Sequence, residues 1–267
     1  AGESTPTLGA NITAGTMTLE KDAVVKVNMN GRTLTAELAG EGTYDLEGMS
    51  LGSVSLGADW TGAVRLKDQT YETSKEIWMD NLRTAESWLE FSGFKGYDKS
   101  WASSASGYPD LAANIRLTDG VDKPAWEFTA CASGNGYTMN ATGKWEGDGE
   151  FRFSGVNQQG VKFTGDISGW DGKLTSQASG ARTVTFAGAA DEVNAEIDTL
   201  GSGALNVIVD NAATFSKNVD ATKLTINSGK SAALTGGAQI DTLAGAGTLV
   251  VNGADTTTTI GSGTDFS

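Results

Sequence analysis

Any hydrolytic chemistry in this sequence of 267 residues must come from carboxylates, tyrosine, lysine or oxygen-bound cations, because the chain contains no histidine. Without imidazole, a Ser-His-Asp or Cys-His site cannot form, and the commonest catalytic zinc sites lose their usual ligand. Two aspartates recur in a matching context, Asp198 and Asp241, each between an isoleucine and a threonine. Paired Asp-Thr-Gly loops are typical of aspartic proteases, where two carboxylates share one proton. Here Leu200 and Leu243 replace the glycine, so we favour turn or ladder roles and keep catalysis as the alternative.

Carboxylate pairs could also hydrolyse glycosides, which requires an acid and a base or nucleophile up to about 9.5 Å apart. Acidic residues are dense enough for this in two segments, which contain Asp119, Asp122 and Glu127, and Glu146, Asp148 and Glu150. The chain has 33 acidic residues in all, so solvated edges and turns explain most of them. A glycosidase therefore stands beside the aspartic-type protease as an alternative.

Aromatic residues in the segment Gly96 to Pro109 suggest a binding site. This segment interrupts the strand pattern with serine and glycine while presenting Tyr97, Trp101 and Tyr108. Exposed aromatic rings stack on the apolar faces of sugars, and long ordered loops often carry function. We expect either glycan binding by these three residues or rings that fold back over an apolar flank.

Composition restricts the cofactors and partners. The formal net charge is −14 and no run of lysine or arginine occurs, which argues against nucleic acid and anionic membranes as partners. No apolar stretch approaches the roughly 18 residues that a membrane helix needs, so we expect no membrane insertion by this segment. Calcium is a candidate cofactor, because Gly261-Ser262-Gly263-Thr264-Asp265 fits half of a calcium-binding repeat, but it occurs once. Otherwise we expect no cofactor and no metal.

The elements that would position these residues are short strands. Val25, Val27 and Met29 alternate with polar residues, and similar units recur between turns rich in glycine, which contributes 36 residues. The 43 residues between Ile197 and Ile240 equal about two turns of slightly more than twenty residues each. Short strands, glycine turns and this period predict an all-β fold, a right-handed parallel β-helix (a solenoid), with a β-sandwich or barrel as the alternative.

We expect residues 1–267 to form a single β-solenoid with two compositionally different parts. All seven tryptophans fall between Trp60 and Trp170, within an aromatic-rich part that spans residues 44–180 and includes the loop 96–109. Residues 181–267 form a part rich in glycine, alanine and threonine. The strand edges at the two ends of such a stack are open, which allows self-association.

Three segments resemble a known family. Val161 to Leu174 with its continuation Thr183 to Gly188, and the glycine- and threonine-rich segments Leu224 to Gly229 and Gly245 to Val251, resemble the autotransporter-associated β-strand repeat. The resemblance covers about residues 145 to 255 well and 10 to 100 loosely. It implies a passenger-type β-helix of a verrucomicrobial or other Gram-negative-type bacterium, such as those that live in gut mucus. It transfers no catalytic residue.

These observations support two functional hypotheses. The first is an extracellular or surface-exposed β-helical protein that acts as an adhesin or structural stalk and binds host mucus glycans or mucin. The alternative is a carboxylate-dependent hydrolase, an aspartic-type protease or a glycosidase, that acts on mucin. Because the repeat carries no catalytic residue, we favour the non-enzymatic hypothesis.

Overall fold

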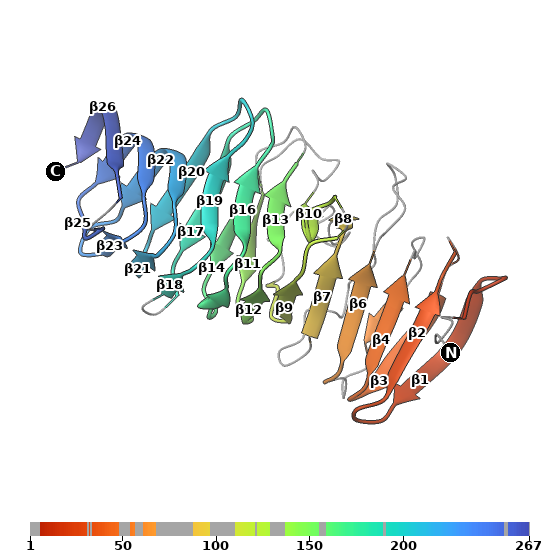
Figure 1. The fold of residues 1–267 in the computed structure, drawn as a ribbon. Helices are drawn as coiled ribbons and strands as arrows, with labels where there is room; N and C mark the ends of the chain where they lie inside the picture. Colours follow the sequence, from red (N-terminus) through yellow and green to blue (C-terminus); the bar gives the residue numbers. More distant parts are fainter. Residues whose placement is uncertain are drawn as a thin grey trace.

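The computed structural model describes residues 6–30, 32, 34–47, 54–56, 61–67, 88–96, 110–120, 122–128, 137–154, 159–188, 191–253 and 256–266. Within these ranges the chain forms strands and no helix, and therefore no helix that could cross a membrane. The strands stack into an elongated solenoid with the two termini at opposite ends (Figure 1). Every pair of neighbouring strands is parallel. The prediction of an all-β parallel solenoid is confirmed, and the sandwich alternative is not what forms.

The strands belong to four sheets that run along the stack. The three-stranded sheet contains β1 (Ile12–Leu19), β3 (Leu34–Gly40) and β5 (Val54–Leu56). The seven-stranded sheet contains β2 (Val24–Asn28), β4 (Thr43–Glu47), β6 (Ala63–Lys67), β7 (Trp88–Ser92), β9 (Asn114–Leu117), β12 (Trp145–Gly147) and β15 (Gly169–Trp170). The four-stranded sheet contains β18 (Asp191–Val193), β21 (Ala212–Phe215), β23 (Ser231–Leu234) and β25 (Thr248–Val251).

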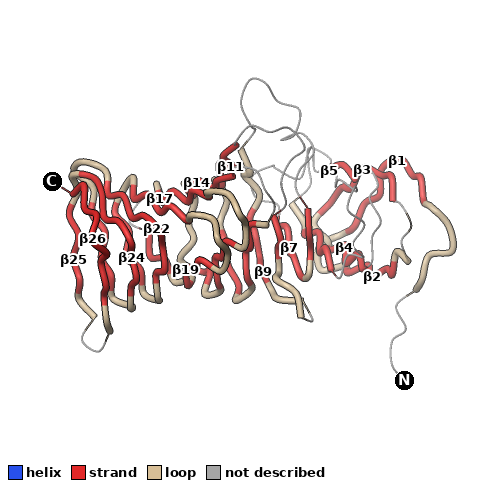
Figure 2. The backbone as a smooth tube through the Cα atoms, turned by 90° about the horizontal axis from the view of Figure 1, so that it is seen from above, coloured by secondary structure: helices blue, strands red, loops and turns tan. Residues whose placement is uncertain are grey.

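The twelve-stranded sheet joins two faces of the solenoid. Its members are β8 (Phe94–Gly96), β10 (Trp126–Phe128), β11 (Tyr137–Ala141), β13 (Glu150–Phe153), β14 (Gln159–Phe163), β16 (Lys173–Ser176), β17 (Arg182–Phe186), β19 (Glu196–Thr199), β20 (Leu205–Val209), β22 (Val219–Ile226), β24 (Ala238–Gly245) and β26 (Thr258–Phe266). One end of β22 pairs with β19 and its other end pairs with β20. In the preceding turn, residues 200–204 separate β19 from β20. Strand β22 has no such interruption and pairs with both, so the two faces merge there. Figure 2 shows the stack from above.

The predicted period of slightly more than twenty residues is present from β14 to β20. Phe163 pairs with Phe186 and Phe186 with Val209, which is 23 residues further along at each step. Equivalent positions therefore form columns that run along the inside of the solenoid. Each inward side chain packs on the equivalent residue of the turns before and after it, which explains why alternation is required in every strand.

The interior changes composition along the stack. Buried rings are in contact from Phe91 to Trp126 (centroids 4.5 Å apart), Trp145 (6.0 Å from Trp126) and Trp170 (5.5 Å from Trp145). Fully burying one large apolar side chain stabilises a fold by roughly 1.5–3 kcal/mol. After Phe215 the interior consists of aliphatic residues such as Leu234. The core is therefore aromatic in the middle of the chain and aliphatic near the C-terminus.

Glycines close the sharp corners between faces. At the corner from β12 to β13, Gly147 has a φ of +100°, which side-chain-bearing residues rarely adopt. A Cβ on Gly147 would lie 2.1 Å from the carbonyl oxygen of Leu117 in the turn below. Gly40 and Gly245 repeat the positive φ and the close approach at their own corners. The Gly-x-Gly sequence at each of these corners is therefore explained by the close contact between successive turns.

Candidate functional site

The most extended polar arrangement among the described residues is a column of alternating charges on the outer face of the seven-stranded sheet. We call it the charge ladder, and its members are Asp45, Arg65, Glu90, Arg116 and Glu146. They occupy directly paired positions on β4, β6, β7, β9 and β12. Each lies at an outward position of its strand, because side chains alternate along a strand. The column stops at β15, where Gly169 pairs with Glu146.

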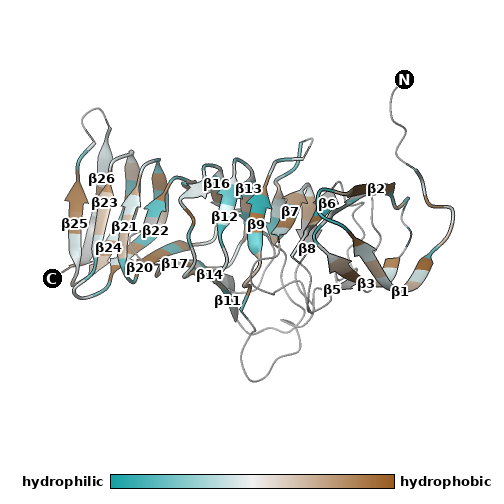
Figure 3. Ribbon diagram, turned by 90° about the horizontal axis from the view of Figure 1, so that it is seen from below, coloured by the Kyte–Doolittle hydropathy of each residue, from teal (hydrophilic) through white to brown (hydrophobic). Residues whose placement is uncertain are grey.

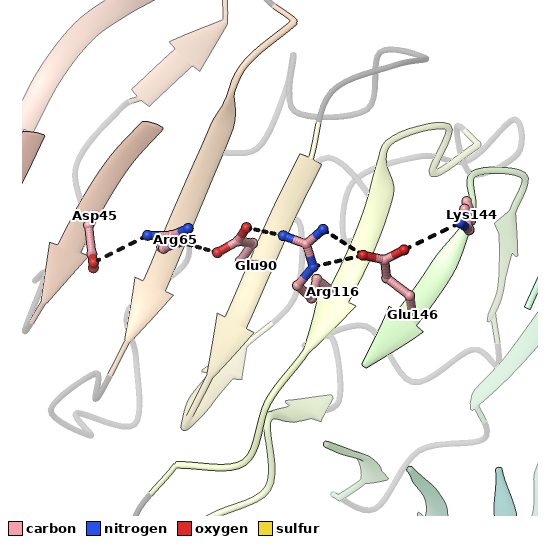
Figure 4. Close-up of polar contacts among 6 residues, drawn as sticks. All are labelled: Asp45, Arg65, Glu90, Arg116, Lys144 and Glu146. Atoms are coloured by element: carbon pink, nitrogen blue, oxygen red, sulfur yellow. Dashed lines mark hydrogen bonds and ion pairs between the residues drawn. The ribbon is translucent and has the colours of Figure 1, made fainter. Parts of the chain in front are cut away.

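Successive members of the charge ladder are joined by ion pairs (Figure 4). Arg65 lies 3.9 Å from Asp45 through its Nη1 atom and donates a hydrogen bond from Nε to Glu90. Arg116 places Nη1 2.6 Å from Oε1 of Glu90. It also binds Oε1 of Glu146, at 2.5 Å from Nη2 and 2.8 Å from Nε. Each arginine thus bridges two carboxylates from the strands on either side of it.

Two further side chains, Lys144 and Trp88, contact members of the ladder. Lys144 lies 3.4 Å from Oε2 of Glu146 through its Nζ atom. The guanidinium carbon of Arg116 lies 4.6 Å above the ring centroid of Trp88, which is within cation–π range. Partial burial raises the pKa of the Glu146 carboxyl, but its contacts with Arg116 and Lys144 outweigh this and hold the pKa below its usual value. Glu146 is therefore a charged structural partner rather than a proton donor at neutral pH.

Each carboxylate of the ladder accepts contacts from cations on the strand beside it, which is the pattern of a structural network. Hydrophilic segments are visible on β9 and β12 in Figure 3, whereas β25 is hydrophobic. The sequence already contained the signal, because each ladder residue except Glu146 stands between two large apolar residues, as in Val64-Arg65-Leu66. Their pairing was not visible, because these residues lie 25, 26 and 30 positions apart at successive steps.

Asp198 and Asp241 lie two strands apart, on β19 and β24, with β22 between them. The expected separation of two turns is therefore present. The prediction that Asp198 and Asp241 occupy equivalent positions is wrong by two residues. Val219 pairs with both Ile197 and Ala238, so Gln239 rather than Asp241 lies in line with Asp198. The register differs because β24 belongs to shorter turns than β19.

A salt bridge already occupies Asp198, whose Oδ2 lies 2.8 Å from Nζ of Lys173. Between the two candidates lies Asp220, a residue that sequence reasoning missed. Burial raises the pKa of the Asp220 carboxyl, and the negative charges of Asp198 and Asp241 raise it further. Strand β22 thus places a carboxyl with a perturbed pKa between the two predicted ones.

Three of the other carboxylates proposed for glycoside hydrolysis, Asp119, Glu127 and Glu150, lie around Arg152 and raise its pKa, Glu150 the most. Asp119 accepts hydrogen bonds from the backbone N–H groups of Ala125 (3.0 Å) and Glu150 (2.7 Å), which is a turn-stabilising role. Glu150 binds Arg152 through two hydrogen bonds of 2.6 and 2.8 Å. Glu146 belongs to the charge ladder, and Asp148 is exposed at a corner. The structure therefore places four of these six carboxylates beside cations or backbone N–H groups and leaves two exposed, Asp122 and Asp148.

The predicted aromatic site, Tyr97, Trp101 and Tyr108, lies outside the described residues, as does most of the loop 96–109. The side chains of the calcium candidate at residues 262–265 are also outside them, although their backbone belongs to β26. Among the side chains that the structure does describe, no three histidine, cysteine, aspartate or glutamate residues are grouped to hold a metal ion. Both sites remain predictions from the sequence.

Comparison of this chain with protein-family models, with curated proteins and with solved structures found no match.

Proposed function

We propose that this chain is a secreted or surface-exposed β-solenoid that acts as a structural stalk or adhesin. The observation that supports this role best is the continuous stack, in which the twelve-stranded sheet extends from β8 to β26. Every turn in such a stack covers the apolar face and strand edges of its neighbours, so local opening is costly and proteolysis is slow. Resistance to proteolysis suits a protein that works outside the cell.

The adhesive ligand in this proposal is a mucus glycan. Tyr97, Trp101 and Tyr108 are the proposed contacts, because aromatic rings stack on sugars while neighbouring polar groups bind the hydroxyls. The resemblance to passenger-type repeats supports an extracellular or cell-surface location.

One observation favours a second candidate, a carboxylate-dependent hydrolase. A general acid needs a carboxyl whose pKa is raised, and the pKa of Asp220 is raised beside two further carboxylates. In this alternative Asp198 and Asp241 supply the ionised partners. The salt bridge between Lys173 and Asp198 argues against this alternative, because it restrains the carboxylate that would have to act as nucleophile or base.

One experiment with intact mucin distinguishes these functions. The purified protein is incubated with mucin, and released fragments and bound protein are both measured. The same is done for the Asp198→Asn/Asp241→Asn variant, for Tyr97→Ala/Trp101→Ala/Tyr108→Ala, and for a control that removes an exposed carboxylate, Asp148→Asn.

An adhesin binds mucin without cleaving it and loses binding in the aromatic variant alone. Cleavage that disappears in the aspartate variant, but not in the control, would overturn the non-enzymatic proposal. If the wild-type protein neither binds nor cleaves, a structural stalk remains the function that fits the fold.

A further inference from the structure

We propose that the charge ladder sets the register of successive turns in the N-terminal half of the solenoid, where the connections between strands are too long to do so. Register here means which residue of one strand pairs with which residue of the next. The inference concerns how the chain reaches one structure and does not depend on the proposed function.

Two connections in this half of the chain are long, although other corners have only one or two residues. Twenty residues, 68–87, separate β6 from β7, and seventeen residues, 97–113, separate β8 from β9. The entropy of closing a flexible loop changes slowly with its length, so a connection of this size closes almost equally well onto a strand shifted by two residues. Loop length therefore does not select the register of β7 or β9.

The apolar interior does not select the register by itself. Leu89 and Phe91 of β7 point inward and pair with Val64 and Leu66 of β6. A shift of one residue would expose this apolar set, whereas a shift of two residues would keep an apolar side chain at one inward position and bring Ser87 or Gly93 to the other. The interior thus excludes odd shifts and opposes even shifts less strongly.

The charge ladder excludes the even shifts. If β7 moved by two residues along β6, either Trp88 or Ser92 would lie opposite Arg65 in place of Glu90. The partly buried guanidinium groups of Arg65 and Arg116 would then lose a carboxylate that they share in the native pairing. Leaving such a charge without its partner is unfavourable, and a polar group at one position is a known means of specifying register.

The C-terminal half has a different arrangement, which supports the inference. Connections of two residues join β15 to β16 and β18 to β19, and such short corners leave little freedom for a shift. Outward positions on β19 and β22 place two negative charges, Asp198 and Asp220, near one another instead of alternating charges. Charge alternation thus continues across the two longest connections and is interrupted between β19 and β22, where no connection exceeds five residues.

Disulfide trapping tests the proposal directly. Lys67 and Ser92 are paired across β6 and β7, so the variant Lys67→Cys/Ser92→Cys, with Cys131→Ser to remove the native thiol, forms a disulfide in the native register. A shift of two residues moves the strand by about 6.6 Å, which takes the two Cα atoms beyond bridging distance. Disulfide yield therefore reports the fraction of molecules in native register.

Charge reversal is then introduced into this cysteine background. Glu90→Arg places three arginines in consecutive strands, and we expect most of the disulfide yield to be lost while the amides of β7 remain protected from hydrogen exchange. A second variant reverses the sign of all five ladder residues together with Lys26, which pairs with Asp45, and Lys144. Alternation is kept in that variant, so we expect the yield to recover.

Glu196→Arg is the matched control, because it reverses a carboxylate that pairs with Lys173 in turns with short connections. The yield should stay at the parent level. Three results would each overturn the proposal: an unchanged yield in Glu90→Arg, loss of both yield and amide protection there, which means local unfolding, or failure of the complete reversal to restore the yield.

Discussion

Removing the central carboxylate of the charge ladder should destabilise the turns around β7 by about 2 kcal/mol. Glu90→Gln keeps the shape of the side chain but removes the charge that Arg65 and Arg116 both contact. Exposed ion pairs contribute about 0.2–1 kcal/mol each, whereas breaking a buried pair costs about 3–5 kcal/mol. The Glu90 side chain is 14% exposed and its arginine partners are 30% and 40% exposed, so the expected cost lies between these limits.

Native-state hydrogen exchange measures this cost locally, which matters because stacked repeats can open part by part. A loss of about 2 kcal/mol makes the β7 amides exchange roughly thirty-fold faster. The matched control is Glu196→Gln, which removes a carboxylate that is 38% exposed and 3.5 Å from Lys173. It should cost less than about 0.5 kcal/mol in its own strand, because Lys173 keeps its contact with Asp198. If the two substitutions have equal small effects, the reasoning that shared, partly buried carboxylates hold these turns together is refuted.

Three further predictions concern the corner, the interior and the aspartate between β19 and β24. Gly147→Ala should lower the free energy of unfolding by more than about 1 kcal/mol, because alanine disfavours a φ of +100° and its Cβ would collide with the Leu117 carbonyl, and chemical denaturation should detect it. Trp126→Ala should cost about 3–5 kcal/mol by leaving a cavity among the stacked rings, measured by thermal unfolding against the wild-type protein. Asp220→Asn should stabilise the protein at neutral pH, because burial and two nearby aspartates raise the pKa of the Asp220 carboxyl and make its ionised form unfavourable. That penalty is complete above the raised pKa and disappears as the pH falls to the ordinary value of an aspartate, so wild type and variant should converge in acid; a constant difference at every pH would contradict the assignment.

The fold class was predictable because its signals are local. Alternation such as Val25, Val27 and Met29, together with glycine turns, requires only neighbouring residues to be read correctly. The period of slightly more than twenty residues then indicated stacked turns, and the columns from Phe163 through Phe186 to Val209 have that spacing. Trp170, at the end of the aromatic-rich part, is buried with its indole N–H donating to the carbonyl of Gly149.

The candidate sites were predicted less well, because they depend on which turns lie side by side. Asp198 and Asp241 were correctly separated by two turns, but their register, the Lys173 salt bridge and the intervening Asp220 all depend on β22 and on turns of unequal length. Aligning similar sequence segments locates equivalent positions only when every turn has the same number of residues, and the turns of this chain differ in length.

The sequence by itself determined that the chain forms short parallel strands around an apolar interior, since strand alternation and turn residues act over a few positions. Only the tertiary structure decided the charge ladder. Arg65 lies 25 residues from Glu90, and Arg116 lies 30 residues from Glu146. Partners at such variable separations come together only when each long connection has closed and each strand has found its register, and the resulting contacts are properties of the stacked turns rather than of any segment.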